Sequence, residues 1–173
     1  MFNRLFRSIY RLRKSGVMSR STIGVCIVNI IFQRFFGISR RFPYQVHFTS
    51  KITAPAKVVI KGNEFELYKC LALNGGILIQ GSNGVDIDSS VLIAPGVKII
   101  SGNHDLNNFF SEAVFDNKIE IHQHCWLGAN SVILPGVVLK KGTIVGAGSV
   151  VVKSFNDEDI VIAGNPAKVI KRY

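Results

Sequence analysis

The sequence predicts an all-β fold, a parallel β-helix built from six-residue repeats, with an α-helical extension before it and a short tail after it. The first observation is the period, because every sixth residue between Ile121 and Val151 is aliphatic, which neither a 3.6-residue helix nor a two-residue strand pattern would produce. The second is the residue four places after each aliphatic one, which is small or β-branched, with glycines crowding the positions between. The aliphatic positions are Ile121, Leu127, Ile133, Leu139, Val145 and Val151. Each repeat is therefore predicted to form a short strand and a corner.

Length and composition are those of one domain with a sizeable core. The 173 residues are 47% hydrophobic, which suits the filled interior of stacked coils. The formal net charge of +10 is uneven, since residues 1–42 carry nine Lys/Arg and no Asp/Glu, whereas residues 43–173 carry 12 basic and 11 acidic residues. Cys26, Cys70 and Cys125 are odd in number and have neither disulfide-framework nor CxxC spacing. They predict a reducing compartment, for which the cytoplasm fits best.

Residues 1–43 form the first predicted unit, a basic, amphipathic helical region. In residues 1–20 apolar side chains recur at helical spacing, with the arginines mostly on the other side. Ser21 and Thr22 are candidate caps of a second helix, which has its own apolar stripe. That stripe consists of Ile23, Ile27, Ile30, Ile31 and Phe35. Two interpretations stay open: the stripes pack on the first coils or a neighbouring subunit, or residues 1–42 attach the protein peripherally to the anionic inner face of the cytoplasmic membrane.

The second predicted unit is the β-helix at residues 44–155, and a tail follows at residues 156–173. Six-residue spacing opens at Val46, is blurred across the segment KGNEFELYKC, and is taken up again from Leu73. No nucleic-acid-reading motif accompanies the N-terminal charge, so no nucleic-acid partner is expected.

Two irregularities interrupt the repeat. An eight-residue step after Ile79 predicts two extra residues at a corner around Ser82-Asn83-Gly84. The 22 residues from Ile99 to Ile121 equal three repeats plus four, so one coil is predicted to be interrupted by a loop excursion at residues 101–118. A polar, aromatic-bearing loop on a rigid scaffold is a frequent location of function.

Two segments resemble a known family. LGANSVILPGVVLKKGTIVGAGSVV, followed by IAGNPAKVIKRY, resembles the left-handed β-helix acyltransferases, in particular the maltose/galactoside/xenobiotic and polysaccharide O-acetyltransferase branch. The resemblance covers roughly residues 46–173. It implies a left-handed β-helix, a homotrimer with active sites between neighbouring subunits, and transfer of an acetyl group from acetyl-CoA to a sugar hydroxyl. The acceptor that it implies is a cell-surface polysaccharide or a glycan precursor.

The resemblance makes His104 the candidate catalytic base. In the segment IAPGVKIISGNH, Ala94 precedes His104 by ten residues, as the corresponding pair does in the family. Attack of a hydroxyl on a thioester needs a base, and imidazole titrates near the right pH. The proline that usually follows this histidine in the sugar acetyltransferases is Asp105 here, which resembles the polysaccharide-modifying relatives. Asp105 is a candidate to orient the imidazole or to contact the acceptor.

Three further residues are candidates for binding the acceptor. Asn74 stands where the sugar acetyltransferases carry an acceptor-contacting asparagine, but Asn74-Gly75-Gly76 is equally well interpreted as a tight corner. At the next corner the family has an acceptor-contacting aspartate. This chain has Ser82 there, and Asn83 is the candidate substitute.

The resemblance also implies a coenzyme A site. Trp126, the only tryptophan, corresponds to a residue that flanks the thioester tunnel near the histidine of the adjacent subunit. The segments Gly128-Ala129 and Ala147-Gly148 correspond to the backbone that receives the pantetheine arm. Basic side chains near the coenzyme A site would bind the phosphate groups of coenzyme A. The remaining candidates are Lys153, Lys168 and Lys171 for the phosphates, and Asn165 and Pro166 for the turn beside the adenine.

Other functions compete with this one. His122, His124 and Cys125 invite a zinc interpretation, but Cys125 falls on the inward position of the repeat, so no metal is expected. The alternatives are N-acetylation of an amino sugar or another small molecule and, less favoured, a γ-carbonic anhydrase-like metalloprotein or a non-catalytic β-helix.

Overall fold

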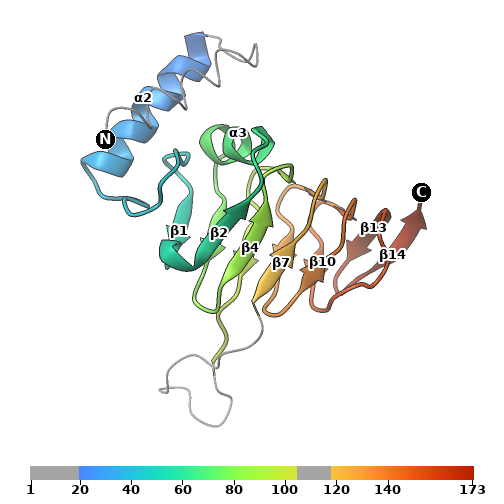
Figure 1. Cartoon of the computed structure of the whole chain (residues 1–173). Coiled ribbons are helices and arrows are strands. Elements are labelled where there is room, and N and C mark those ends of the chain that lie inside the picture. The colour runs from blue at the N-terminus through green and yellow to red at the C-terminus, as the bar shows by residue number, and fades with distance from the viewer. Residues whose placement is uncertain (1–19, 105–117) are drawn as a thin grey trace.

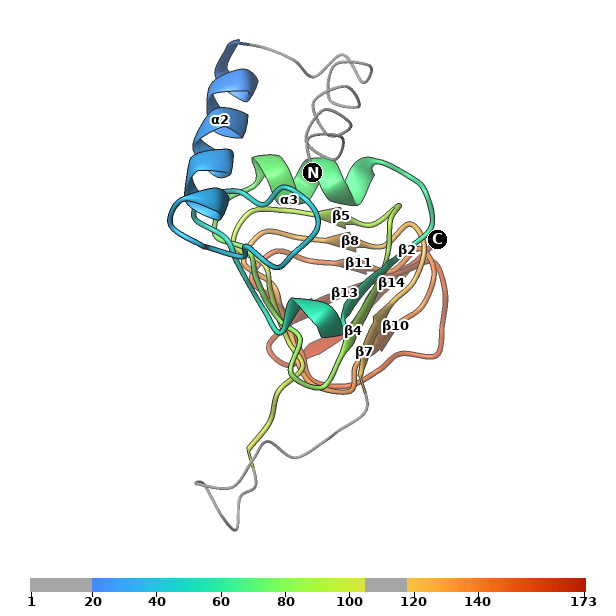
Figure 2. The same cartoon turned by 60° about the vertical axis from the view of Figure 1, so that its left-hand side comes forward.

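Three sheets of short strands wind the chain into a β-helix. The structure, a computed structural model, describes residues 20–104 and 118–173. Figure 1 shows the coils stacked from β1 toward β14, and Figure 2 shows the sheets as three sides of a prism. Sheet A contains β1 (Lys51–Thr53), β3 (Leu78–Gln80), β6 (Lys98–Ile100), β9 (Val132–Ile133) and β12 (Val150–Val151). Sheet B contains β2 (Val58–Lys61), β4 (Val85–Asp88), β7 (Ile119–Ile121) and β10 (Val138–Leu139). Sheet C contains β5 (Leu92–Ile93), β8 (Trp126–Leu127), β11 (Ile144–Val145), β13 (Ile160–Gly164) and β14 (Ala167–Arg172).

The predicted period describes the core. Parallel pairing places each aliphatic leader over the leader three repeats later, as in Leu127 opposite Val145 and Ile133 opposite Val151. All six leaders from Ile121 to Val151 are buried. Because a single coil cannot bury its own aliphatic side, the stack buries one continuous column that stabilises every coil through its neighbours.

The corners repeat as regularly as the core. Every sixth residue adopts a left-handed backbone conformation with a φ of 57° to 74°, which is why glycine or asparagine dominates there. These positions are His124, Asn130, Gly136, Gly142 and Gly148. Gly128 is needed for another reason, since a Cβ there would lie 2.6 Å from the carbonyl oxygen of Val145 in the next coil.

The first coil departs from the predicted pattern. Helix α3 (Glu66–Leu73) begins in the blurred segment, takes the place of a sheet C strand and contacts β5. It includes Leu73, so the prediction that the six-residue spacing resumes at Leu73 is wrong. Its side chains Leu67 and Leu71 are fully buried, so α3 closes part of the core. Val46 is also buried, although the first strand, β1, begins only at Lys51 and follows a short segment of turns. A 3₁₀ helix, η1 (Pro55–Lys57), joins β1 to β2.

Helix α2 (Arg20–Arg34) lies against this end of the stack and contacts α3. Ser21 and Thr22 lie inside the helix, so the prediction that they cap it is wrong. The stripe along Ile23, Ile27 and Ile31 faces solvent rather than the first coil of the same chain. The helix predicted for residues 1–20 falls almost wholly outside the described residues.

The opposite end of the stack finishes in a hairpin. Strands β13 and β14 pair antiparallel and continue sheet C beyond the last coil. In the described part of the chain, no helix is long and apolar enough to cross a membrane.

Candidate active site

The three corners of each coil line up into three edges along the prism. The A–B edge, between sheets A and B, contains residues 54–57, 81–84, 101–104, 134–137 and 152–155. The C–A edge contains residues 74–77, 94–97, 128–131, 146–149 and 164–166. The B–C edge contains residues 62–65, 89–91, 122–125, 140–143 and 156–159. The edge on which each candidate residue lies determines which candidates one chain brings together.

His104 lies on the A–B edge, where the chain leaves sheet A after β6 and returns at β7. Its side chain is exposed, and its backbone N–H donates to Asn103 Oδ1 at 3.0 Å. An exposed imidazole at the head of an excursion can accept a proton from a bound hydroxyl. Asp105 lies outside the described residues.

Ser82 and Asn83 share the A–B edge with His104, in the preceding coil. The backbone N–H of Asn83 donates to Ser101 Oγ at 3.0 Å, and Ser101 Oγ donates to the carbonyl of Gln80 at 2.7 Å. These bonds tie the corner at Ser82-Asn83 to the strand end that precedes His104. The structure therefore brings the two acceptor candidates and the candidate base to one edge.

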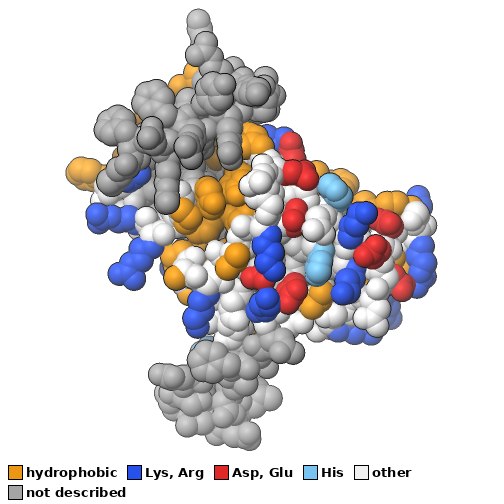
Figure 3. Space-filling view, in the orientation of Figure 1, with side chains coloured by type: hydrophobic (Ala, Val, Ile, Leu, Met, Phe, Trp, Pro, Cys, Tyr) orange, Lys and Arg blue, Asp and Glu red, His pale blue; other side chains and the backbone are white. Residues whose placement is uncertain are grey.

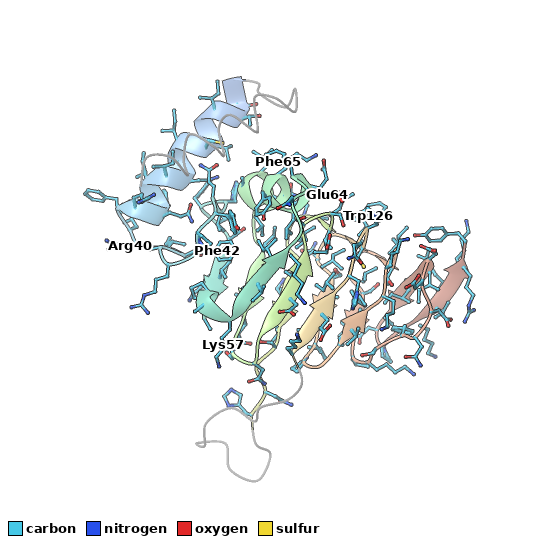
Figure 4. All side chains as sticks on the ribbon, viewed as in Figure 1. Arg40, Phe42, Lys57, Glu64, Phe65 and Trp126 are labelled. Atoms are coloured by element: carbon cyan, nitrogen blue, oxygen red, sulfur yellow. The ribbon has the colours of Figure 1, made fainter. Side chains whose placement is uncertain are left out.

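Lys57 is a residue of this edge that the sequence interpretation missed. Its ammonium donates to the carbonyl oxygen of Ser82 at 2.8 Å, and Figure 4 shows it beside the place where the excursion leaves the prism. It adds positive charge to the surface near His104. The available signal was its distance from Ile52, which places Lys57 at the same corner of the first coil.

Asn74 lies on a different edge, the C–A edge, where it ends α3. Its side-chain amide donates to the carbonyl oxygen of Ile93 at 2.6 Å, and its own carbonyl accepts a bond from Ser50 Oγ at 3.3 Å. These contacts hold a corner together. The structure thus favours the corner interpretation of Asn74 over acceptor binding beside His104 of the same chain.

The backbone candidates for coenzyme A line up on the C–A edge. Ala147 and Gly148 are exposed, and Gly148 N–H donates to the carbonyl of Ala129 at 2.8 Å, one coil earlier. Nothing lies within 4 Å of the position of a Cβ on Gly148. Asn165 and Pro166 are exposed at the same edge of the last coil. Gly128, by contrast, is buried between coils.

Trp126 stands on the outer face of sheet C, two residues before Gly128 of the C–A edge. Its indole is 49% exposed and lies in register between Leu92 of β5 and Ile144 of β11. In Figure 4 it is on the opposite side of the prism from Lys57. Sheet A separates the two candidate edges, so one chain does not bring His104, Trp126 and the C–A edge together.

The three candidate phosphate-binding lysines are spread over the last coils. Lys153 follows β12 on the A–B edge, Lys168 lies near the C–A edge, and Lys171 lies farther along β14. All three are exposed, and none forms an ion pair with a described residue. Within one chain they do not form a single cluster.

The histidine–cysteine segment is built into the B–C edge. His122 Nε2 lies 3.8 Å from a Glu120 carboxylate oxygen, and the backbone N–H of His124 donates to Ser90 Oγ at 2.9 Å. Burial raises the pKa of the Cys125 thiol to about 12, so the side chain is a neutral core group. Among the described residues no group of three or more His, Cys, Asp or Glu side chains is placed to hold a metal ion.

The outer faces of the sheets differ in chemistry. Sheet B is charged: Asp86 bonds to Lys61 at 2.7 Å and to Lys118 at 2.6 Å, and Glu120 lies next to them. Figure 3 shows this mixture of basic and acidic side chains over β2, β4, β7 and β10. The outer face of sheet C is mostly apolar, with Leu92, Trp126, Ile144 and Val161. The outer face of sheet A is mixed: Leu78, Val132 and Val150 lie in one row with Lys51 and Lys98, and Ile100 lies in the next row with Thr53 and Gln80.

Known proteins share this repeat. Residues 118–153 match the family described as bacterial transferase hexapeptide (six repeats). The putative lipopolysaccharide biosynthesis O-acetyl transferase WbbJ of Escherichia coli K12 is 37% identical over 117 residues, covering 58% of this chain and 57% of that protein. The galactoside O-acetyltransferase of the same organism is 30% identical over 112 residues, covering 64% of this chain and 55% of that protein. The hexapeptide repeat of this family is therefore present in residues 118–153 of the chain.

Solved structures of hexapeptide-repeat proteins have the same fold. A maltose O-acetyltransferase from Clostridium difficile 630 superposes with a TM-score of 0.58 at 24% identity, covering 71% of this chain and 63% of that one. The N-acyltransferase AntD from Bacillus cereus, in complex with dTDP and 3-hydroxybutyryl-CoA, also has a TM-score of 0.58, at 19% identity, covering 75% of this chain and 79% of that one. The predicted left-handed β-helix is confirmed. The chain spans about half the length of the curated relatives it matches.

Proposed function

We propose that this protein is an acetyl-CoA-dependent O-acetyltransferase that modifies a sugar hydroxyl, with a cell-surface polysaccharide or a glycan precursor as the acceptor. The observation that carries the proposal is the position of His104, an exposed imidazole at the head of the excursion, on the same edge as Ser82 and Asn83. The names of the O-acetyltransferase relatives support the reaction. The proposed location is the cytoplasm, which agrees with the reducing compartment predicted from the cysteines and supplies acetyl-CoA as the acyl donor.

The reaction is a direct transfer. His104 accepts the proton of the acceptor hydroxyl while that oxygen attacks the carbonyl carbon of the thioester. A tetrahedral intermediate forms, and its oxyanion is stabilised by hydrogen-bond donors. The C–S bond then breaks, the acetyl group stays on the sugar oxygen, and the imidazolium returns its proton to the departing thiolate. Neither a covalent acyl-enzyme nor a metal is needed.

A homotrimer supplies the complete site. Sheet A separates the A–B edge from the C–A edge within one chain, which supports a site in which His104 and the coenzyme A segments come from different subunits. The mostly apolar outer face of sheet C and the mixed aliphatic and basic outer face of sheet A are the faces proposed to pack between subunits, whereas the ion-paired face of sheet B suits solvent. When a face of one subunit packs against a different face of the next subunit, repetition of this heterologous contact closes the proposed trimer into a ring. His104 then faces Trp126 of the partner subunit.

Coenzyme A would lie along the C–A edge. The exposed backbone at Ala147-Gly148 carries no side chain larger than a methyl group and is proposed to receive the pantetheine arm, and Asn165 and Pro166 follow at the end of the same edge. Lys168 is the candidate nearest this end for a phosphate group. Lys153, on the A–B edge, would reach the same ligand only from the other subunit of the interface.

Acceptor screening tests the reaction class. The purified protein is incubated with acetyl-CoA and with matched pairs of sugars that differ only in a hydroxyl or amino group, including nucleotide-linked and lipid-linked sugars, and release of coenzyme A thiol is followed. Acetylation of hydroxyl acceptors with little turnover of the amino partners is the expected result. Turnover of the amines alone would replace O-transfer by N-transfer. Binding of acetyl-CoA without turnover of any acceptor would reject the proposal in this form.

A further inference from the structure

Helix α2 has its apolar and polar faces reversed relative to a helix that packs on a core. The side chains of Ile23, Ile27 and Ile31 are 42%, 54% and 47% exposed, and Phe35, whose N–H donates to the carbonyl of Ile31 at 2.8 Å, is 86% exposed. These residues are spaced four apart and line one side of the helix, here called the outer stripe. A stripe this apolar normally faces the core of a protein.

The opposite side of α2 is held to the protein by polar side chains. Asn29 is fully buried, donates through Nδ2 to the carbonyl of Ala72 at 2.8 Å, and accepts the N–H of Phe48 at 2.8 Å. Gln45 Nε2 donates to the carbonyl of Cys26 at 2.8 Å. Gln33 bonds to the backbone of residues 44 and 46. Because buried polar groups are costly to separate, these bonds fix the orientation of the helix and keep the outer stripe turned outward.

Aromatic side chains extend the outer stripe at the end of α2. The ring centroids of Phe35 and Phe36 are 5.7 Å apart, and Phe36 is 63% exposed. Phe32 packs against Phe36 at 5.1 Å and against Phe48 at 5.3 Å, which anchors this end to the protein. The exposed apolar surface is therefore continuous from Ile23 to Phe36.

The charge around the outer stripe has a single sign. Arg34, Arg40 and Arg41 are exposed, and Figure 4 shows Arg40 beside the end of α2. Residues 1–42 contain nine Lys/Arg and no Asp/Glu. A protein partner would ordinarily meet a mixture of charges at the rim of its interface, whereas a purely cationic rim complements a surface of anionic headgroups.

We propose that α2 docks the protein onto an anionic lipid bilayer, lying in the headgroup region with Ile23, Ile27, Ile31 and Phe35 inserted and with the arginines on the phosphates. A helix of 15 residues extends over about 22 Å at 1.5 Å per residue, which suits a helix lying along the interface. Apolar insertion and charge attraction act together, since either alone gives weak binding. Lipid docking is independent of the proposed transfer reaction, because it involves no residue of the candidate site.

Vesicle flotation tests the docking. The full-length protein is mixed with vesicles of phosphatidylcholine and phosphatidylglycerol or with vesicles of pure phosphatidylcholine, without acetyl-CoA. Binding to the anionic vesicles only is expected, with a loss as salt is raised, because the Debye length shrinks from about 10 Å at 0.1 M to about 3 Å at 1 M. The double variant Ile27→Gln/Ile31→Gln should bind about tenfold or more weakly, because two inserted side chains are lost. Arg40→Gln/Arg41→Gln should weaken binding and flatten its salt dependence.

A matched control separates insertion from general hydrophobicity. Val59→Gln changes a side chain of sheet B that is 46% exposed, similar to Ile31, and should bind like the wild type. Circular dichroism and thermal melting confirm that each variant is folded. The proposal is overturned if intact protein ignores anionic vesicles at low salt, or if the Ile27/Ile31 variant binds them as well as the control does. Two further results would overturn it. In the first, only a chain lacking residues 1–19 binds anionic vesicles, because the first residues cover the outer stripe in the intact protein. In the second, the Ile27/Ile31 variant changes the oligomeric state and leaves vesicle binding unchanged.

Discussion

The side-chain amide of Asn29 donates a 2.8 Å hydrogen bond to the carbonyl oxygen of Ala72. Ala72 lies in the last turn of α3, where a helix has no partner of its own for its carbonyl groups, so Asn29 joins the two helices by satisfying one of them. Both residues are almost completely buried, at 0% and 1% exposed. The orientation of α2, and with it the outward direction of its apolar stripe, depends on this contact.

Replacing Asn29 by Leu should destabilise the protein. The variant leaves the Ala72 carbonyl and the Phe48 N–H without their partner, at a cost of about 1–3 kcal/mol for each buried group. Urea unfolding followed by circular dichroism measures the loss. Ile27→Ala, on the exposed side of the same helix, should change the unfolding free energy by less than about 1 kcal/mol. Equal losses of unfolding free energy in the two variants would show that the hydrogen bonds of Asn29 do not hold α2 to the protein.

Gly128 and Gly148 should respond differently to alanine, although both lie on the C–A edge. A Cβ on Gly128 would be 2.6 Å from the Val145 carbonyl oxygen and 2.7 Å from the Ala147 nitrogen, so Gly128→Ala must push two coils apart, at about 1–3 kcal/mol or more. Gly148 has open space around it and a φ of +68°, so Gly148→Ala carries only the backbone cost of about 1–2 kcal/mol. Thermal melting of the two variants measures which substitution destabilises the protein more. A more stable Gly128→Ala protein would contradict the close approach of the coils.

Asp86 should make stability depend on pH. Burial raises the pKa of this carboxyl, but hydrogen bonds from Lys118 and Lys61 outweigh burial, and the pKa lies below its ordinary value. A carboxyl whose pKa is lower in the folded than in the unfolded chain stabilises the fold at pH values above its unfolded-state pKa of about 3.9. This stabilisation is lost as the pH falls through the folded-state pKa. Asp86→Asn should therefore be less stable than the wild type at pH 7, with a difference that shrinks below about pH 4.

Unfolding free energies measured from pH 7 to pH 2 test this dependence. Asp157→Asn is the control, because its carboxylate pairs with Arg172 in an exposed site where such pairs contribute little. A constant difference between wild type and Asp86→Asn across this range would show that the ion pairs of Asp86 do not stabilise the fold.

The sequence predicted the parts of this fold that repeat and missed those that do not. The leaders from Ile121 to Val151 are buried as expected, because parallel pairing at an offset of 18 residues, a multiple of six, aligns each leader with another. Helix α3 was missed because the segment that contains it fits neither the hexapeptide period nor a long amphipathic helix. The Ser21 and Thr22 caps were wrong because α2 begins earlier than its apolar stripe suggested.

The candidate site was predictable residue by residue but not in its arrangement. His104, Ser82 and Asn83 share an edge because each follows a sheet A strand, a relationship that requires the assignment of every coil to its three sheets. Asn74 resembled an acceptor-binding residue in sequence, yet its amide is bonded to Ile93. The side-chain contacts of a corner depend on the neighbouring coil and are not visible in the corner's own sequence.

A shared active site predicts complementation between two inactive variants. His104→Ala lacks the base, and Ala147→Trp fills the C–A edge where coenzyme A is proposed to lie, so each homotrimer should be inactive. In every mixed trimer one of the three sites takes an intact His104 from one variant and an intact C–A edge from the other, so purified mixed trimers should regain about a third of wild-type activity. Co-expressed chains carrying two different affinity tags provide the mixed protein. Inactive mixed trimers, or an active monomer in sedimentation, would place the whole site within one chain.

Steady-state kinetics of His104→Ala tests the central claim most directly. Turnover with acetyl-CoA and a hydroxyl acceptor should fall by about 10²–10⁴, the usual contribution of a general base, while the dissociation constant for acetyl-CoA stays nearly unchanged. His124→Ala is the matched control, an exposed histidine on the B–C edge whose loss should leave turnover close to the wild-type value. Activity of His104→Ala within a few-fold of the wild type would contradict the account, because the base would then be another residue.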